Sequence, residues 1–445
     1  MDRRIDFISC NTKNGFIKMT VPILFAMILN MAYNLVDSLW IGNLLGETAF
    51  AALTSSTPVI LILTSIAMGM TQGVTILLSR AIGSKDEMLV SRYISTSLVF
   101  SIVFSVVVSI LFEININGIL NLLNTPYDLL ATARQYLSIY IWGYATVYLY
   151  CYFAAVLRSF GDSVFQALAM LLCTILNAIF DPILIHFLGL QGAAVATVGT
   201  QVLSLGIMCL YIKRKSLFCI NLKDFDVYCN SSLIIKGVVS TVQQLIPAIS
   251  TSILTSLVSI YGVTALASFG IISKLEVILF YPAMAINMAL TSIIGQCIGG
   301  KRFDRAKSYM KIALTYGALL LCILVIIFFF FSGYLSRFFI RKYEIEEIVN
   351  IYFKIVGVGY ILTMITNCFF GCLNGMGKPS KSLLCMIITY LLARLPLAWC
   401  FNQMLHSING IWIGILLSHI IAVILLTVVV NREMIYLENH HHEKI

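Results

Sequence analysis

Long apolar segments alternate with short polar connections along the whole chain, a pattern that predicts an all-helical membrane protein. Each segment is about twenty residues long, the length that an α-helix needs to cross a bilayer. The segments form two sets of six, separated by a basic connection that contains Lys213, Arg214 and Lys215. The predicted spans are residues 19–41, 54–78, 94–112, 136–156, 165–187, 192–212, 233–261, 268–294, 310–331, 351–373, 383–401 and 410–430.

Composition supports the same fold class. Hydrophobic residues make up 60% of the 445-residue chain, charged residues 11%, and the mean hydropathy is +0.94. Soluble domains average about 45–50% apolar and about 25% charged residues. The net charge of +9 therefore indicates basic cytoplasmic loops rather than a nucleic-acid partner.

The distribution of Lys and Arg predicts the orientation in the membrane, because cytoplasmic loops carry an excess of these residues. With both termini in the cytoplasm, the basic residues gather in the loops on that side. These are Arg80, Lys85, Arg92, Arg158, Lys213, Arg214, Lys215, Lys223, Lys301, Arg302, Arg305, Lys307, Lys311, Lys378, Lys381 and Arg432. We expect a multi-pass protein of the cell (plasma or inner) membrane with both termini inside.

The two sets of six segments are repeats of one another. A shift of 216 residues aligns 44–85 with 260–301 without a gap, and it also pairs Gly161 with Gly377. Because each repeat has an even number of spans, both enter the membrane from the same side. The sequence thus predicts two lobes, residues 1–222 and 223–445, related by pseudo-two-fold symmetry about the membrane normal. A substrate cleft between the lobes would open alternately to each side.

Polar side chains are expected at one depth in the first lobe. Asp37 and Asp181 lie near the outer ends of the first and fifth spans, and Thr197 lies near the outer start of the sixth. Asn177 is one helical turn from Asp181 and shares its face. A carboxylate at the centre of a membrane helix costs roughly 2.5–3.5 kcal/mol on insertion scales, so it is a functional candidate by default.

The spaced motifs resemble one family of transporters. The segments VPILFAMILNMAYNLVDSLWIG, GVTILLSRAIGSKD, LRSFGDS and LNAIFDPILIHFLGLQGAAVAT, with IIGQCIGGKRFDRAKS and LNGMGKP in the second half, are similar to the multidrug and toxic compound extrusion (MATE) family. The likeness covers nearly the whole chain and is greatest for the bacterial DNA-damage-inducible (DinF-like) branch. It implies a cation-coupling site, for H⁺ or a bound Na⁺, at Asp37, Asn177, Asp181 and Thr197. The turn GLQGAA is shorter than the family pattern, which leaves Thr200, one turn away, as an alternative to Thr197.

The second lobe lacks these acids. The repeat places Ile253 opposite Asp37 and the segment 394–397 opposite 178–181, so coupling is expected in the first lobe only. Lys274, Glu276 and Arg394 also lie within predicted spans. An ion-pair role and a pathway role remain open for Lys274 and Glu276, and the role of Arg394 is equally open.

A ribbon of tyrosines follows the fourth span at i, i+4 spacing. It offers π faces and hydroxyl groups to an organic cation, although a packing ridge with interfacial anchors fits the spacing as well and is favoured. The ribbon consists of Tyr136, Tyr140, Tyr144, Tyr148 and Tyr152. The candidates for the substrate pathway are Tyr33, Asn34, Tyr140, Tyr144 and Tyr148.

These features predict a secondary active antiporter that exports amphipathic, cationic drugs or metabolites in exchange for H⁺ or Na⁺. We expect a monomer in the lipid bilayer, without a cofactor or a nucleic-acid partner. A lipid-linked oligosaccharide flippase of the same wider superfamily is the first alternative, but it would need a strongly basic cavity. An integral membrane enzyme is the second. The histidines His186, His406 and His419 are isolated, and GQCIGGK has Arg302 where a P-loop requires Ser or Thr.

Overall fold

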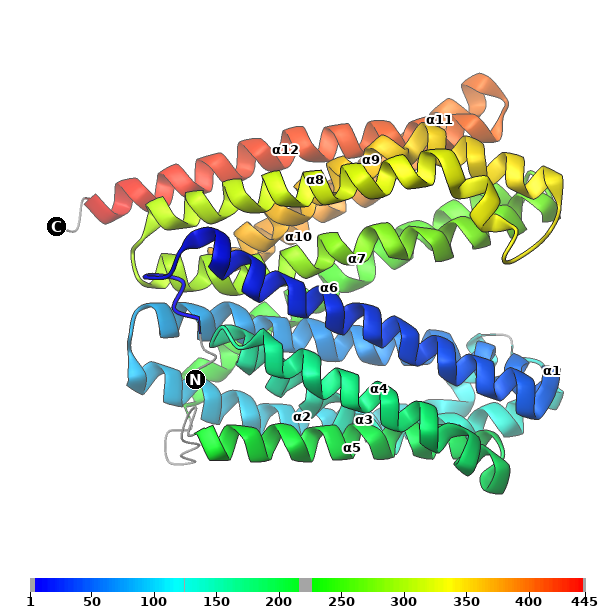
Figure 1. Cartoon of the computed structure of the whole chain (residues 1–445), viewed down its shortest axis with the longest axis horizontal. Coiled ribbons are helices and arrows are strands. Elements are labelled where there is room, and N and C mark those ends of the chain that lie inside the picture. Colours follow the sequence, from blue (N-terminus) through cyan, green and yellow to red (C-terminus); the bar gives the residue numbers. More distant parts are fainter. Residues whose placement is uncertain (1–4, 124, 216–225, 443–445) are drawn as a thin grey trace. The chain divides into compact units, whose positions relative to one another are not determined.

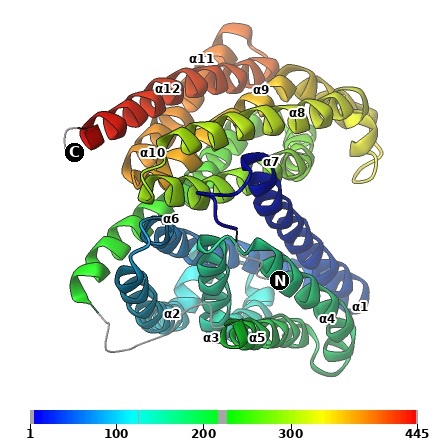
Figure 2. The ribbon, with the colours of Figure 1, turned by 60° about the vertical axis from the view of Figure 1, so that its left-hand side comes forward.

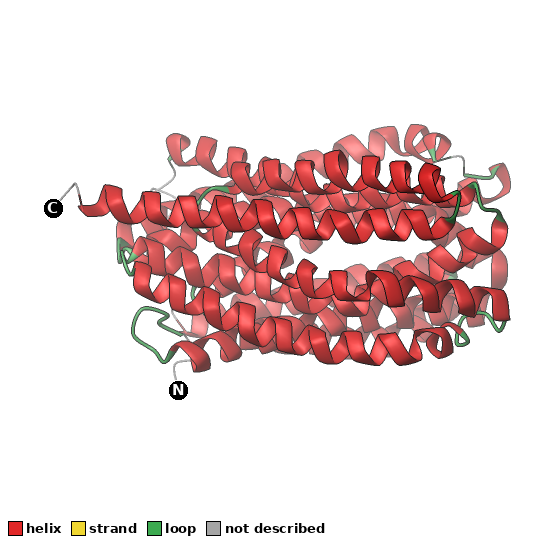
Figure 3. Ribbon diagram, turned by 90° about the horizontal axis from the view of Figure 1, so that it is seen from above, coloured by secondary structure: helices red, strands yellow, loops and turns green. Residues whose placement is uncertain are grey.

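The computed structural model describes residues 5–123, 125–215 and 226–442, and its regular elements in these ranges are all helices (Figure 1, Figure 3). Eleven of these helical segments are long and apolar enough to cross a membrane. In chain order the elements are α1 (Thr12–Gly83), α2 (Glu87–Leu122), α3 (Tyr127–Ser159), α4 (Ser163–Leu188), α5 (Leu190–Lys215), α6 (Val227–Ser259), α7 (Val263–Gly299), α8 (Phe303–Ser336), α9 (Tyr343–Gly375), α10 (Pro379–Met386), the π-helix η2 (Ile387–Ala393), α11 (Arg394–Leu405) and α12 (Ile408–His442).

Helix α1 contains the first two predicted spans without an intervening loop. Its 72 residues correspond to about 110 Å of helix, far more than the hydrocarbon thickness of about 30 Å. The helix is broken only at Gly46, where φ is 79° and ψ is −167°, a conformation that favours glycine. The two expected spans, 19–41 and 54–78, are thus two helices that meet at the kink at Gly46. The count of twelve spans is confirmed.

The eleventh span is less regular than the single helix expected at 383–401. It begins as α10, continues through the π-helical turn of η2 and ends as α11. Pro396 explains part of this irregularity, because proline has no backbone N–H and crowds the carbonyl four residues earlier. The Ser250 hydroxyl donates to the Tyr390 carbonyl at 2.9 Å, so a side chain of α6 stabilises the irregular turn.

The chain divides into two compact units. One unit contains Val21–Thr241, and the other contains Asp6–Thr20 together with the chain from Val242 onward. The first unit thus holds most of α1, all of α2 to α5 and the first half of α6. The predicted lobe boundary at 222/223 falls within 216–225, outside the described residues.

The internal repeat is visible in the backbone of both units. Three pairs of residues 216 positions apart share a left-handed φ: 79° and 91° in the first pair, 57° and 58° in the second, and 78° and 75° in the third. These pairs are Gly46 with Gly262, Lys85 with Lys301, and Gly161 with Gly377. Lysine rarely adopts a positive φ, so its recurrence at one repeat position confirms the 216-residue register.

In the first unit, small residues allow α1 and α6 to approach closely. A Cβ atom on Gly69 would lie 2.2 Å from the Thr241 Cα, and one on Gly73 would lie 2.6 Å from the Gly237 nitrogen. Small residues four apart on both helices are a common device for helix contact in membranes. The second half of α1 is therefore fixed against the first half of α6.

In the second unit, α9 occupies a central position. It packs against α7, α8 and α12, and α8 and α12 run beside it in two views (Figure 1, Figure 2). Aromatic rings fill the interior: Tyr352 meets Trp412 edge-on at 4.8 Å between centroids, and Phe328 lies 5.0 Å from Phe353. This interior also holds a polar cluster, in which the hydroxyls of Tyr352 and Tyr360 on α9 donate to the carboxylate of Glu276 on α7.

The contact between α1 and α6 generates a stability prediction. Gly69→Ala should destabilise the protein by about 1–3 kcal/mol, the range for overpacking, because the new methyl group would overlap the Thr241 backbone. Gly206→Ala on α5 is the matched control, since a Cβ there meets nothing within 4 Å and alanine is the better helix former. Thermal unfolding in detergent should show a lower melting temperature for Gly69→Ala and an unchanged or higher one for Gly206→Ala. Equal melting temperatures would contradict the close packing.

Candidate functional site: a buried acid pair in the first unit

Three helices of the first unit bring the predicted polar residues together in its interior. Asp37 comes from α1 and is 8% exposed, Asp181 and Asn177 come from α4 and are fully buried, and Thr197 of α5 is 5% exposed. Helix α4 continues through Pro182, which follows Asp181 directly. The spacing of Asn177 and Asp181 places both on one face, and the Asn177 Nδ2 group donates to Asp181 Oδ1 at 2.9 Å.

The two acids are neighbours. The carboxyl groups of Asp37 and Asp181 lie within hydrogen-bonding reach of each other. Two ionised carboxylates at this separation repel strongly in a low-dielectric interior. A proton shared between them, or a cation held by both, removes that repulsion. The pair can therefore exchange one positive charge with its surroundings.

Four oxygen atoms at this place are buried and lack a hydrogen-bond partner. They are Asp37 Oδ1, Asn177 Oδ1, Asp181 Oδ2 and Thr197 Oγ1. Buried polar side-chain atoms in proteins are nearly always paired, so one orphan oxygen from each of the four predicted residues is an unusual concentration. Carboxylate, amide and hydroxyl oxygens are the ligands that hard cations prefer. The donor set fits Na⁺, and the acid pair alone fits H⁺.

Thr197 and its alternative, Thr200, differ in their hydrogen bonding. The Thr200 hydroxyl already donates to the backbone within α5, at 2.8 Å to the Ala196 carbonyl. The Thr197 hydroxyl oxygen has no partner. The Thr200 oxygen still has its lone pairs, but its proton is already used, whereas the Thr197 hydroxyl has neither a donor nor an acceptor partner.

Tyr33 belongs to this site, whereas Asn34 lies outside it. Tyr33, one turn before Asp37, is buried, and its hydroxyl donates to the Thr197 carbonyl at 3.4 Å. Asn34 is exposed, and its Nδ2 group donates to the Asn30 carbonyl of the same helix at 2.7 Å. The structure thus brings one of these two pathway candidates to the acids.

Tyr136, named from the sequence only as part of the tyrosine ribbon, lies close to the acid pair. It is 2% exposed and close enough to Asp37, Asp181 and Tyr33 for electrostatic interaction. Its place at the outer end of the tyrosine ribbon, near the depth assigned to the acids, could have identified it.

The other ribbon tyrosines pack inside the unit. Tyr140, Tyr144 and Tyr148 are all buried. The Tyr144 hydroxyl donates to the Leu63 carbonyl of α1 at 3.0 Å, and its ring meets Tyr148 edge-on at 6.0 Å. The Tyr152 hydroxyl likewise donates to the Ile94 carbonyl of α2 at 2.9 Å. These are the contacts of a packing ridge, and a pathway role for Tyr140, Tyr144 and Tyr148 stays a prediction.

The corresponding place in the second unit is apolar. An open groove of about 410 Å³ lies there, and its lining contains no ionisable side chain. It is lined by Ile253, Leu254, Leu257, Leu391, Leu395, Pro396 and Trp399. Ile253, the repeat counterpart of Asp37, is thus on a groove wall with no polar partner for a cation.

Comparison with known proteins gives consistent results. The MatE family model matches residues 22–183 and 240–400, one stretch in each repeat. The chain is 27% identical over 420 residues to the "Probable multidrug resistance protein YpnP" of Bacillus subtilis (strain 168), covering 94% of each chain. It is 26% identical over 433 residues to the "FAD transporter" of Shewanella oneidensis, covering 95% of each chain.

Solved structures share the fold. One is titled "Outward-facing conformation of a multidrug resistance MATE family transporter of the MOP superfamily", with a TM-score of 0.91, 22% identity and coverage of 97% of this chain and 98% of the other. Because the family model accounts for well over half of the chain, with one match in each repeat, this protein belongs to the multidrug and toxic compound extrusion family, whose members are membrane transporters rather than enzymes.

Proposed function

We propose that this transporter is an antiporter that exports small amphipathic molecules in exchange for H⁺ or Na⁺ bound at the acid pair of the first unit. The observation that carries the proposal is the set of four buried oxygens without partners that Asp37, Asn177, Asp181 and Thr197 contribute, together with the interaction between the two carboxyl groups. A site of this kind gains most from a positive charge, and the second unit has an apolar groove at the corresponding position.

The proposed coupling depends on whether a proton or Na⁺ is bound between the two carboxylates. With the site empty of cations, the two negative charges repel, and the helices that carry them favour a separated arrangement. A proton or Na⁺ lets α1, α4 and α5 pack closely. The ion shifts the balance between the two arrangements only by its difference in affinity for them. Alternating access then links ion entry to substrate release on the outer side.

The substrate class rests on the relatives and on the acidic character of the site. Curated relatives are named for multidrug resistance, and one is named for FAD. We favour an organic cation as the substrate, and FAD, an anionic dinucleotide, is the alternative substrate. Uptake assays with ethidium and with FAD distinguish these two possibilities.

The central experiment neutralises Asp37 while keeping its shape. In proteoliposomes, Asp37→Asn should reduce ethidium transport driven by a proton or Na⁺ gradient to the level of empty vesicles, because one carboxylate alone has no repulsion for the ion to relieve. Glu47→Gln is the matched control, since Glu47 is an exposed acid on the same helix, and it should transport like wild type. Imposing each gradient separately identifies the coupling ion.

Two results would contradict this mechanism. One is an Asp37→Asn protein that still accumulates ethidium against its gradient with unchanged ion dependence. The other is an equal loss of transport in Ile253→Ala, because Ile253 is the apolar repeat counterpart of Asp37 in the second unit.

A second prediction concerns the neutral oxygens of the site. If Na⁺ is the bound ion, Thr197→Val removes a free ligand and should raise the Na⁺ concentration for half-maximal thermal stabilisation roughly three- to tenfold, the value of about one hydrogen bond. Thr200→Val is the control, because its hydroxyl is already bonded to the backbone, and it should leave that concentration unchanged. Identical shifts in both variants would remove Thr197 from the site. A wild-type protein that Na⁺ does not stabilise would assign the site to H⁺.

A further inference from the structure

Glu276 is the one acidic residue within the predicted spans of the second half of the chain, and the acid pair of the first unit does not explain it. It lies on α7, thirteen positions after the first residue of that helix. The hydroxyls of Tyr352 and Tyr360, both on α9, donate to one carboxylate oxygen, Oε1. Hydrogen bonds donated to a carboxylate favour its ionised form. A negative charge within a membrane protein is stable only with a positive charge nearby.

Lys274 is close to Glu276 in the sequence, but it does not supply that positive charge. Its side chain is exposed, and Nζ lies 5.6 Å from the centre of the Phe339 ring. Residues two apart on a helix point in different directions. Among the ion pairs of the described residues, none includes Lys274 or Glu276. The positive charge must therefore come from another helix.

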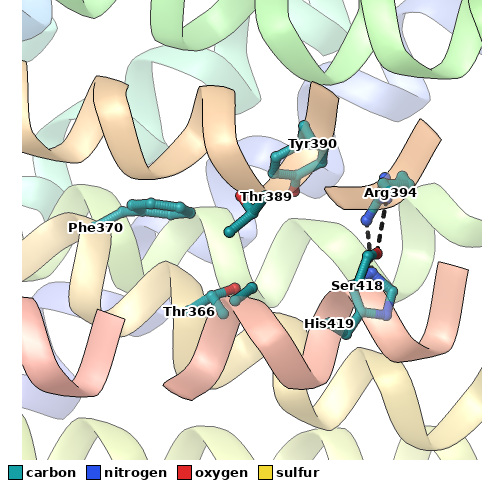
Figure 4. Close-up of a pocket in the computed structure, with 8 residues that line it drawn as sticks. Thr366, Phe370, Thr389, Tyr390, Arg394, Ser418 and His419 are labelled. Carbon is teal, nitrogen blue, oxygen red and sulfur yellow. Dashed lines mark hydrogen bonds between the residues drawn. The ribbon is translucent and has the colours of Figure 1, made fainter. Parts of the chain in front are cut away.

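Arg394, at the start of α11, is held by two neutral side chains of α12 (Figure 4). Its Nε group donates to Ser418 Oγ at 3.3 Å, and Nη2 lies 2.6 Å from His419 Nε2. Because arginine can only donate hydrogen bonds, His419 Nε2 accepts, and the imidazole is neutral with its proton on Nδ1. The guanidinium also lies over the Tyr390 ring, 4.3 Å from its centre. These contacts fix the positive charge without neutralising it.

The cavity beside Arg394 leaves no room for an external anion. Its volume is about 10 Å³, the space of a single water molecule. Its walls carry no charged side chain other than Arg394 itself, since His419 is neutral. The charge that balances the guanidinium therefore belongs to the protein.

A short series of contacts connects Arg394 with Glu276. Gly359 precedes Tyr360 on α9, and a Cβ atom on Gly359 would lie 2.4 Å from His419 Nδ1. The imidazole thus lies directly against the backbone that carries Tyr360. His419 contacts Arg394 on one side of this series, and Tyr360 contacts Glu276 on the other. The two charges are close enough for electrostatic interaction, which a low-dielectric interior strengthens.

The π-helical turn of η2 determines where Arg394 points. The Arg394 N–H donates to the Thr389 carbonyl, five residues earlier, whereas an α-helix would direct it to the Tyr390 carbonyl, four residues earlier. The Tyr390 carbonyl accepts instead from Ser250 Oγ of α6 at 2.9 Å. A regular α-helix here would rotate the following residues by about 100°, and it would turn Arg394 away from its partners on α12.

We propose that Arg394 is the resident counter-charge of Glu276 and that the π-helical turn positions it. In the proposed antiport, the acid pair of the first unit exchanges a cation with its surroundings, whereas in the second unit the cation is part of the chain. The second unit keeps a balanced charge throughout the transport cycle, so ion exchange is confined to Asp37 and Asp181. The inference goes beyond the proposed antiport and does not rest on it, because the charge balance is a property of the second unit alone.

Thermal unfolding of the full-length protein in nanodiscs measures this pairing through a double-mutant cycle. Arg394→Met and Glu276→Gln should each lower the melting temperature by roughly 5 °C, because each leaves one charge without its opposite. The double variant should be more stable than either single variant. Lys274→Met is the matched control, and its effect should simply add to that of Glu276→Gln. Additive losses for Arg394→Met and Glu276→Gln would overturn the inference.

Labelling with dicyclohexylcarbodiimide distinguishes a counter-charge from a purely structural arginine. This apolar reagent modifies protonated carboxyl groups, and mass spectrometry locates the product. At a temperature below all the melting temperatures, Glu276 should react several times faster in Arg394→Met than in wild type. Arg394→Lys, which keeps the charge, and Lys274→Met should both react like wild type. A structural arginine would change the melting temperature and leave the labelling of Glu276 unchanged.

Equal labelling of Glu276 in wild type and Arg394→Met would overturn the inference, whatever the change in melting temperature. The outcome is independent of the proposed antiport, which Asp37→Asn tests through ion-driven transport. Failure of either result leaves the other interpretable.

Discussion

The contact between Asp37 and Asp181 is the constraint on which the first unit depends. Two unit charges 4 Å apart repel by about 4 kcal/mol at an effective dielectric constant of 20, several times the net value of an ordinary hydrogen bond. The single donor from Asn177 to Asp181 cannot offset that repulsion. In the proposed mechanism, a positive charge between the acids sets how closely α1, α4 and α5 can pack. The Tyr33 hydroxyl on the Thr197 carbonyl keeps α5 within reach of the same pair.

Much of this site could be read from the sequence, because charged side chains are rare in membrane helices. Asp37 and Asp181 were conspicuous for that reason, and the i, i+4 spacing placed Asn177 beside Asp181. The choice between Thr197 and Thr200 needed coordinates, because their different hydrogen bonding depends on local geometry within α5. The partners of Glu276 were also hidden, since Tyr352 and Tyr360 belong to another helix and nothing in their spacing points to α7.

The fold was predictable to the level of spans and repeats, but its irregular turns were not. Apolar length predicted twelve crossings, and the 216-residue shift paired residues that prove to share backbone conformation. The hydrophobic pattern could not predict that the first two spans are joined through a single non-helical residue, Gly46, and not through a loop. The π-helical turn before Arg394 escaped prediction because it depends on Pro396 and on the hydrogen bond from Ser250 to the Tyr390 carbonyl.

The paired left-handed residues also bear on the history of the chain. Three residue pairs keep a left-handed φ in both halves: Gly46 and Gly262, Lys85 and Lys301, and Gly161 and Gly377. In contrast, the repeat position of Asp37 is occupied by Ile253 in the second half. Three matched positions with a positive φ, one of them a lysine, are more simply explained by duplication of a single gene than by three separate origins. The two halves have therefore kept one backbone geometry at these turns while the side chains at Asp37 and its counterpart Ile253 differ. The shape of each half is thus independent of whether that half carries the acids.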